Sequence, residues 1–201
     1  MGNRRAGNGP RLSVLRAGHP FPIDPATVAG CLDPCVEEDL LFQDTWTRVI
    51  AGQAPQVPAR IAPVTGHVAE SVAAILLAGI GFHLFWHLTG PGRHGVDLLM
   101  LDPAGGTAVA WEVKGTLRRR GFPRLSRRDV SQMSPDWLDR HDGTGMSEWG
   151  LAAQDVLGGF VVVSFAQMVM WVGVTADYAS IKPIRDEEQL RDLSWLGHDR
   201  G

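Results

Sequence analysis

Residues 94–116, HGVDLLMLDPAGGTAVAWEVKGT, contain two apolar runs that are separated by a short segment rich in glycine. Each run has the length of a β-strand, and the segment DPAGG between them is typical of a turn. The stretch therefore predicts two adjacent strands, over residues 96–101 and 108–113. Three charged residues, Asp97, Glu112 and Lys114, interrupt these otherwise apolar strands.

The charged residues have a definite arrangement, because Glu112 and Lys114 are two positions apart and point to the same face of their strand. Charges in the interior of a sheet are unfavourable unless they are paired with an opposite charge or bind a ligand such as a metal ion. One interpretation is a Glu–Lys ion pair with Asp97 at a turn. In the other, Asp97, Glu112 and the carbonyl of Val113 hold a divalent cation such as Mg²⁺, and Lys114 orients or activates a water molecule.

Further elements are predicted on both sides of this stretch. Hydrophobic periodicity and turn residues predict a helix over 65–78, strands over 81–89, 160–166 and 169–175, and helices over 126–140, 148–157 and 186–195. In the helix over 65–78, Thr65 is the expected N-cap and Gly79 the expected end. This order predicts an α/β sandwich with a mixed central sheet of about five strands flanked by helices.

The first 63 residues differ in composition from the rest. Residues 1–24 are rich in Gly, Pro and Arg and predict a flexible arm. A short helical segment is expected between residues 34 and 52, and the three prolines of residues 54–63 are typical of a linker. The main domain is therefore expected to comprise residues 64–201.

Composition excludes several classes of protein. The chain has 201 residues, of which 44% are hydrophobic and 20% charged, as in a globular protein with a substantial core. It contains no GxxxxGK[ST] motif for nucleotide triphosphates. We expect no signal peptide, and the longest apolar run, residues 72–86, is too interrupted for a membrane span. The expected location is the cytoplasm.

Positive charge is concentrated in one short segment. Residues 115–128 hold six arginines and no acid, whereas the whole chain has a net charge of −3. These arginines are Arg118, Arg119, Arg120, Arg124, Arg127 and Arg128. A compact basic segment on an acidic background indicates either a solvated run of charge or a surface for a polyanion.

The motifs resemble those of the PD-(D/E)XK nuclease superfamily, which has the restriction-endonuclease-like fold, and in particular its toxin-type or RecB-like branches. The similarity covers about residues 64–176. It is carried by Glu70 on the predicted helix, Asp97 in GVD, Glu112 and Lys114 in WEVKGT, and Gln132 in QMSPDW. Glu70 leaves two possibilities open from the sequence, since it can lie at an exposed corner of its helix or face a site.

The resemblance implies a nuclease that hydrolyses phosphodiester bonds with Mg²⁺ or Mn²⁺. Asp97, Glu112 and the backbone carbonyl of Val113 would bind the metal, with Glu70 as an auxiliary ligand. Lys114 would position or activate water, and Gln132 would orient substrate or water. The six arginines would contact the nucleic-acid backbone.

The same resemblance bears on the substrate and the biological role. DNA is the expected substrate, and the alternatives are an RNase that acts on tRNA and an inactive module that binds nucleic acid. By analogy alone, we favour two roles over that of a repair enzyme. One is an antibacterial toxin with an immunity-protein partner, and the other is a restriction or phage-defence nuclease. A toxin would act in the cytoplasm of a target cell, and a homodimer would suit double-strand cleavage.

Overall fold

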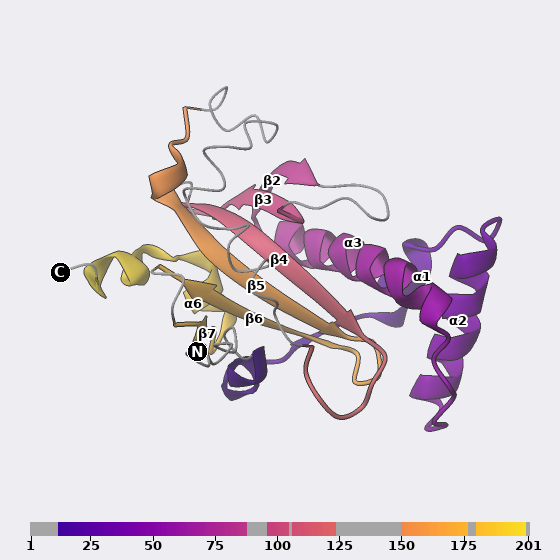
Figure 1. Ribbon diagram of the computed structural model, residues 1–201. Coiled ribbons are helices and arrows are strands. Elements are labelled where there is room, and N and C mark those ends of the chain that lie inside the picture. The colour runs from indigo at the N-terminus through magenta and orange to yellow at the C-terminus, as the bar shows by residue number, and fades with distance from the viewer. Residues whose placement is uncertain (1–11, 88–95, 105, 124–149, 177–179, 200–201) are drawn as a thin grey trace, which may run out of the picture.

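The centre of the protein is a mixed seven-stranded sheet (Figure 1). The structure is a computed structural model that describes residues 12–87, 96–104, 106–123, 150–176 and 180–199. The strands are β1 (Phe21–Pro22), β2 (His83–His87), β3 (Leu98–Leu101), β4 (Ala108–Thr116), β5 (Val156–Ser164), β6 (Val169–Thr175) and β7 (Lys182–Pro183). Their order is β1-β6-β5-β4-β3-β2, and β7 also pairs with β6. The α/β class is confirmed, and the sheet is larger than the five strands expected.

Strands β2, β3 and β4 form an antiparallel meander, which confirms the predicted strand pair. The turn between β3 and β4 is held by Asp102, whose carboxylate accepts hydrogen bonds from the amides of Gly106 and Thr107. Strand β5 runs parallel to β4, whereas β6 is antiparallel to β5. Parallel neighbours require a long crossover connection, which residues 117–155 supply. The helix predicted over residues 126–140 lies outside the described residues.

Strand β5 begins earlier than the sequence predicts. A helix was expected over residues 148–157, but a 3₁₀ turn, η5 (Ala153–Asp155), leads directly into the strand at Val156. All nine residues of β5 are buried. A parallel strand that is covered on both faces reads as a continuous apolar run without alternation, so Val156 and Leu157 carry no periodicity that would separate strand from helix.

Helix α3 (Ala62–Ile80) confirms the helix predicted over residues 65–78 and extends it at both ends. The predicted caps are wrong. The hydroxyl of Thr65 donates to the carbonyl of Ile61 within the first turn, at 2.8 Å. The helix continues through Gly79 and ends at Gly81, whose φ of 116° is in the left-handed region that glycine adopts without strain.

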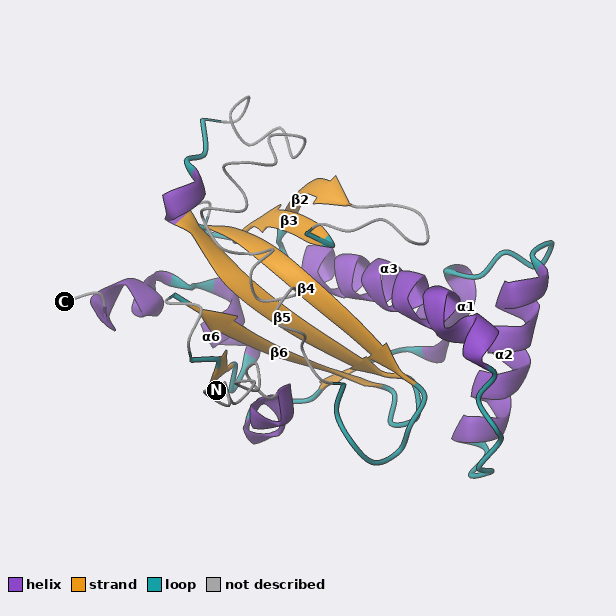
Figure 2. Ribbon diagram, viewed as in Figure 1, coloured by secondary structure: helices purple, strands orange, loops and turns teal. Residues whose placement is uncertain are grey.

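Helix α3, together with the short η2 (Ala59–Ile61), is the one segment in the described ranges that is apolar and long enough to cross a membrane. Its mean hydropathy is 1.6, and 44% of it is buried within the protein. It runs along β4, with α1 (Pro25–Gly30) and α2 (Glu37–Ile50) gathered at its N-terminal end (Figure 2). We therefore interpret α3 as the core helix of a globular domain. The cytoplasmic location stays a prediction.

The predicted flexible arm over residues 1–24 is wrong for residues 12–24. Residues 12–17 form a 3₁₀ helix, η1 (Leu12–Ala17), in which Leu12 and Leu15 are buried. Strand β1 then pairs with β6, with Phe21 opposite Met170. A two-residue strand has no periodicity of its own, so its partner in β6 determines that it forms.

The boundary predicted near residue 64 does not separate two cores. Trp46 of α2 donates its indole N–H to the carbonyl of Phe165, at 3.2 Å. The ring of Phe42, also in α2, lies 5.1 Å from that of Phe165 in an edge-to-face arrangement. Both aromatic residues belong to the hydrophobic cluster that contains α3 and the sheet. Residues 12–63 therefore pack as part of one domain.

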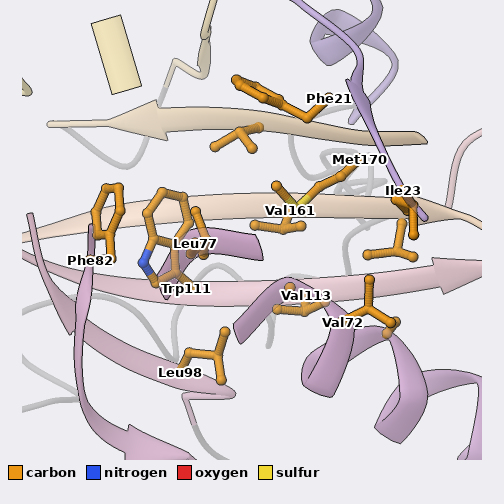
Figure 3. Close-up of a cluster of buried hydrophobic side chains, with 14 of the residues drawn as sticks. Phe21, Ile23, Val72, Leu77, Phe82, Leu98, Trp111, Val113, Val161 and Met170 are labelled. Atoms are coloured by element: carbon orange, nitrogen blue, oxygen red, sulfur yellow. The ribbon is translucent and has the colours of Figure 1, made fainter. Parts of the chain in front are cut away.

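Two apolar layers cover the two faces of the sheet. On one face, Trp111 and Val113 of β4 lie against Val72 and Leu77 of α3 (Figure 3). On the other face, η1 covers residues that include Phe160 of β5. The chain ends in α6 (Glu187–Arg191) and η6 (Ser194–Asp199), close to the helix predicted over 186–195.

Candidate functional site

The predicted site residues gather where β4 extends beyond β3. Strand β3 pairs with β4 only as far as Leu98, which lies opposite Trp111. Strand β4 continues beside β5 to Thr116. Within the described residues, the last part of β4 therefore has a neighbouring strand on the β5 side alone. Asp97 lies directly before β3, next to the open edge of β4.

Asp97 binds this open edge directly. Its Oδ2 atom accepts a hydrogen bond from the backbone N–H of Val113, at 2.7 Å. In a strand, the N–H and the C=O of one residue point to the same edge. The carbonyl of Val113 consequently points to the edge where the Asp97 carboxylate lies. The two predicted oxygen ligands are thus brought to one side of β4.

Glu112 and Lys114 form an ion pair on the face of β4 that is turned away from α3. The ammonium of Lys114 donates to Oε1 of Glu112. The Glu112 side chain is only 4% exposed, whereas that of Lys114 is 28% exposed. Continuing the register of β3 by one residue sets Asp97 opposite Glu112. The ion pair allowed by the sequence therefore exists, and it lies beside the second carboxylate.

Glu70 of α3 interacts electrostatically with the same charges. Burial and, to a smaller extent, the negative charge of Asp97 raise the pKa of Glu70 from 4.5 to about 7, while the positive charge of Lys114 acts in the opposite direction. Such electrostatic effects require that the three groups lie near one another. Glu70 is half-buried, and its placement in the site stays a prediction.

The pKa of Glu70 predicts a pH-dependent stability. Because the folded state holds a proton that the unfolded chain releases above pH 4.5, this residue lowers the free energy of unfolding progressively as the pH rises through 7. The variant Glu70→Gln should therefore be more stable than the wild type at pH 8 in metal-free buffer, by about 1–2 kcal/mol after allowance for partial exposure. Near pH 5 the two should unfold alike in urea.

The exposed Glu38 of α2 offers a matched control, since replacing a surface side chain by one of the same size, as in Glu38→Gln, should change stability by no more than about 0.5 kcal/mol. An equal effect of Glu70→Gln at pH 5 and pH 8 would show that Glu70 does not titrate in this range.

The donor set of the site consists of oxygen atoms. No group of three or more His, Cys, Asp or Glu side chains in the described ranges is placed to hold a metal ion. Asp97 and Glu112 instead form a pair of carboxylates. Mg²⁺ is usually held by one or two carboxylates, together with water and substrate phosphate. The two carboxylates and the carbonyl of Val113 fit this chemistry, whereas zinc prefers nitrogen and sulfur ligands.

The three described arginines of the basic segment follow directly after β4. Arg118, Arg119 and Arg120 are all exposed. Arg119 donates from Nη2 to the carbonyl of Val49 at the C-terminal end of α2, at 3.1 Å, where a cation is favourable. Arg119 therefore connects two elements, a role that the sequence did not indicate. The predicted site residues Arg124, Arg127, Arg128 and Gln132 lie outside the described residues.

Gly115 is a further residue of the site to which the sequence gave no role. A Cβ atom at this position would lie 2.5 Å from the carbonyl oxygen of Thr65 and 2.9 Å from Cβ of Ala69, both on α3. The glycine therefore lets α3, with Glu70, approach the strand that carries Lys114. The available signal was the glycine itself, because glycine inside a strand often marks the close approach of another backbone.

The candidate site combines groups from β4, from the residue before β3 and from α3. Asp97 lies against the open edge of β4, the Glu112–Lys114 pair lies beside it, and Glu70 approaches from α3. Comparison of the chain with protein-family models, curated proteins and solved structures gives no match.

Proposed function

We propose that the protein is a metal-dependent nuclease that hydrolyses phosphodiester bonds in DNA. The observation that carries the proposal is the hydrogen bond from Val113 N–H to Asp97, which joins this carboxylate to the strand that bears Glu112 and Lys114. Two carboxylates and a lysine at the edge of one strand supply both metal ligands and a cation for a phosphate substrate.

We also propose that the fold is restriction-endonuclease-like. A core helix, α3, precedes an antiparallel meander of three strands, and a crossover then leads to the parallel strand β5. This order supports the resemblance that the motifs suggested. Strands β1 and β7 and the N-terminal helices would be additions to such a core.

The proposed mechanism assigns a role to each described residue. Asp97, Glu112 and the carbonyl of Val113 would hold Mg²⁺ or Mn²⁺. When bound, the metal would polarise the phosphodiester and lower the pKa of a water molecule. Lys114, whose side chain reaches solvent, would orient the attacking water and offset negative charge on the phosphoryl oxygens. Glu70 would be the auxiliary carboxyl group beside Asp97. A role for Gln132 stays a prediction.

Substrate choice is tested by offering the purified protein supercoiled plasmid DNA and total RNA in parallel, both with Mg²⁺. We expect the plasmid to be nicked and the RNA to stay intact. Cleavage of RNA alone would support the RNase alternative instead. Binding of either nucleic acid without cleavage would indicate an inactive module. Preparations of the variant Lys182→Met, which alters the one other lysine of the chain, should cleave like the wild type.

The proposed biological setting is that of an antibacterial toxin or a phage-defence enzyme. This setting rests on analogy with single-domain nucleases of the same superfamily. The gene beside this one would separate the possibilities, because an immunity-like protein, a methyltransferase and a helicase each point to a different role.

A further inference from the structure

Three side chains from distant parts of the chain form a stack on one face of the sheet. The ring of Phe122, in the loop after β4, lies 5.1 Å from the ring of Trp171 in β6, at an interplanar angle of 55°. The guanidinium carbon of Arg16, in η1, lies 4.6 Å from the centre of the Phe122 ring. The N-terminal segment and the arginine loop, residues 117–123, are therefore joined at this stack.

The stack lies on the sheet face that carries Lys114. In the strand register, Lys114 of β4 is opposite Val162 of β5, and Val162 is opposite Trp171 of β6. Residues that are opposite one another project from the same face. Neighbouring strands are about 4.8 Å apart, so the backbone of Trp171 is about 10 Å from that of Lys114.

The arginine loop is held at two points. Arg119 is bound to the C-terminal end of α2 through Val49, and Phe122 packs on Trp171. These contacts fix the backbone on both sides of Arg120. Arg16, Arg118 and Arg120 are exposed, and no ion pair joins them to an acid in the part of the chain that the structure describes. Arg16 is thus held against Phe122, Arg118 and Arg120 extend from an anchored loop, and all three are exposed to solvent.

We propose that Arg16, with Arg118 and Arg120, forms a phosphate-binding surface for the nucleic-acid backbone next to the scissile bond. This inference rests on the proposed nuclease function. Guanidinium groups bind phosphate strongly and without regard to base sequence. Phosphates of one DNA strand recur about every 3.4 Å along the helix axis. A DNA strand that passes Lys114 would therefore reach the stack about three nucleotides from the scissile bond.

The stack also assigns a role to Phe122. Because its ring contacts both Arg16 and Trp171, Phe122 holds Arg16 in place and anchors the arginine loop to the sheet, instead of stacking on a base. The segment before β1 thereby becomes part of the substrate surface, although the sequence of residues 1–24 predicted only a flexible arm.

The test is the salt dependence of DNA binding by the full chain carrying Arg16→Met. Methionine keeps an apolar stem that packs on Phe122 but removes the charge. Binding of a fluorescent duplex is measured by anisotropy in EDTA, between 50 and 200 mM salt. Loss of one phosphate contact should reduce the slope of log K against log salt by about 0.9, which weakens binding about 15-fold at 50 mM and about 4-fold at 200 mM.

Two further variants separate charge from structure. Arg16→Lys retains the charge and should retain the slope of the wild type. Arg60→Met removes an exposed arginine of η2 that is paired with Glu37 of α2, and this variant should bind DNA like the wild type.

An unchanged slope in Arg16→Met would overturn the inference, and a lower melting temperature with an unchanged slope would show that Arg16 has only a structural role. If the wild type binds no DNA or RNA, the proposed function itself fails.

Discussion

The variants Glu112→Gln and Lys114→Met should each reduce the rate of DNA cleavage at least about 100-fold, because each removes a group that acts on the reacting phosphate. Glutamine has the size of glutamate but lacks the charge that a divalent cation requires. Methionine fills the space of the lysine stem but has no ammonium to orient water or offset charge. The measurement is kcat/KM for plasmid nicking with saturating Mg²⁺, and Lys182→Met is the control.

The same two variants should differ in stability. Lys114→Met removes the ammonium that pairs with the Glu112 carboxylate, which is 4% exposed, and removing one partner of a buried ion pair lowers the free energy of unfolding by about 3–5 kcal/mol. Glu112→Gln leaves a lysine that already reaches solvent, so the loss should be about 1 kcal/mol or less. Urea denaturation of both proteins measures the difference. Full cleavage by either variant would contradict the site, and equal losses of stability would contradict the asymmetric burial of the pair.

Gly115→Ala is the second change with a large expected effect. The new Cβ would lie 2.5 Å from the backbone oxygen of Thr65, and no change of side-chain rotamer can relieve a contact with backbone. Helix α3 must therefore move away from β4, which should lower the free energy of unfolding by about 2–3 kcal/mol. Cleavage should fall as well, since α3 carries Glu70, whose carboxyl group feels the charges of Asp97 and Lys114.

Gly79→Ala is the matched control for this variant. Gly79 lies in the same helix, and a Cβ there would meet nothing within 4 Å. Alanine should stabilise the helix at this position by about 0.5–1 kcal/mol. If Gly115→Ala has the stability and activity of the wild type, then α3 and β4 do not pack as closely as the structure indicates.

The core of the candidate site could be predicted from local sequence. The alternation of side chains along a strand sets Glu112 and Lys114 on one face, and a short turn brings the preceding strand beside them. Asp97 therefore had to lie near both. These relations depend on residues that are close in sequence, which is why the two strands and their turn agree with the prediction and the ion pair agrees with one of the two interpretations.

Contacts between distant segments could not be predicted in this way. The pairing of Phe21 with Met170 and the hydrogen bond from Arg119 to Val49 depend on the assembled fold. The ends of α3 show the same limit. Gly79 and Gly81 are equally able to end a helix, and the packing of the whole chain determines that Gly81 adopts the left-handed conformation.

Glu70 lies between these cases. Helical periodicity sets it at the border of an apolar face, where exposure and burial are both possible. Its orientation towards Asp97 and Lys114 follows from the way in which α3 rests on β4, and Gly115 permits that approach.

The central claim is that Asp97 and Glu112 hold the metal with which this protein cleaves DNA. Its most direct test is the rate of plasmid cleavage after removal of metal with EDTA, followed by titration with Mg²⁺ or Mn²⁺. The wild type should be inactive without metal and recover to saturation. Asp97→Asn, which can still accept the hydrogen bond from Val113 but lacks the charge, should not recover. Undiminished cleavage by the wild type in excess EDTA, or full recovery of Asp97→Asn, would contradict the claim.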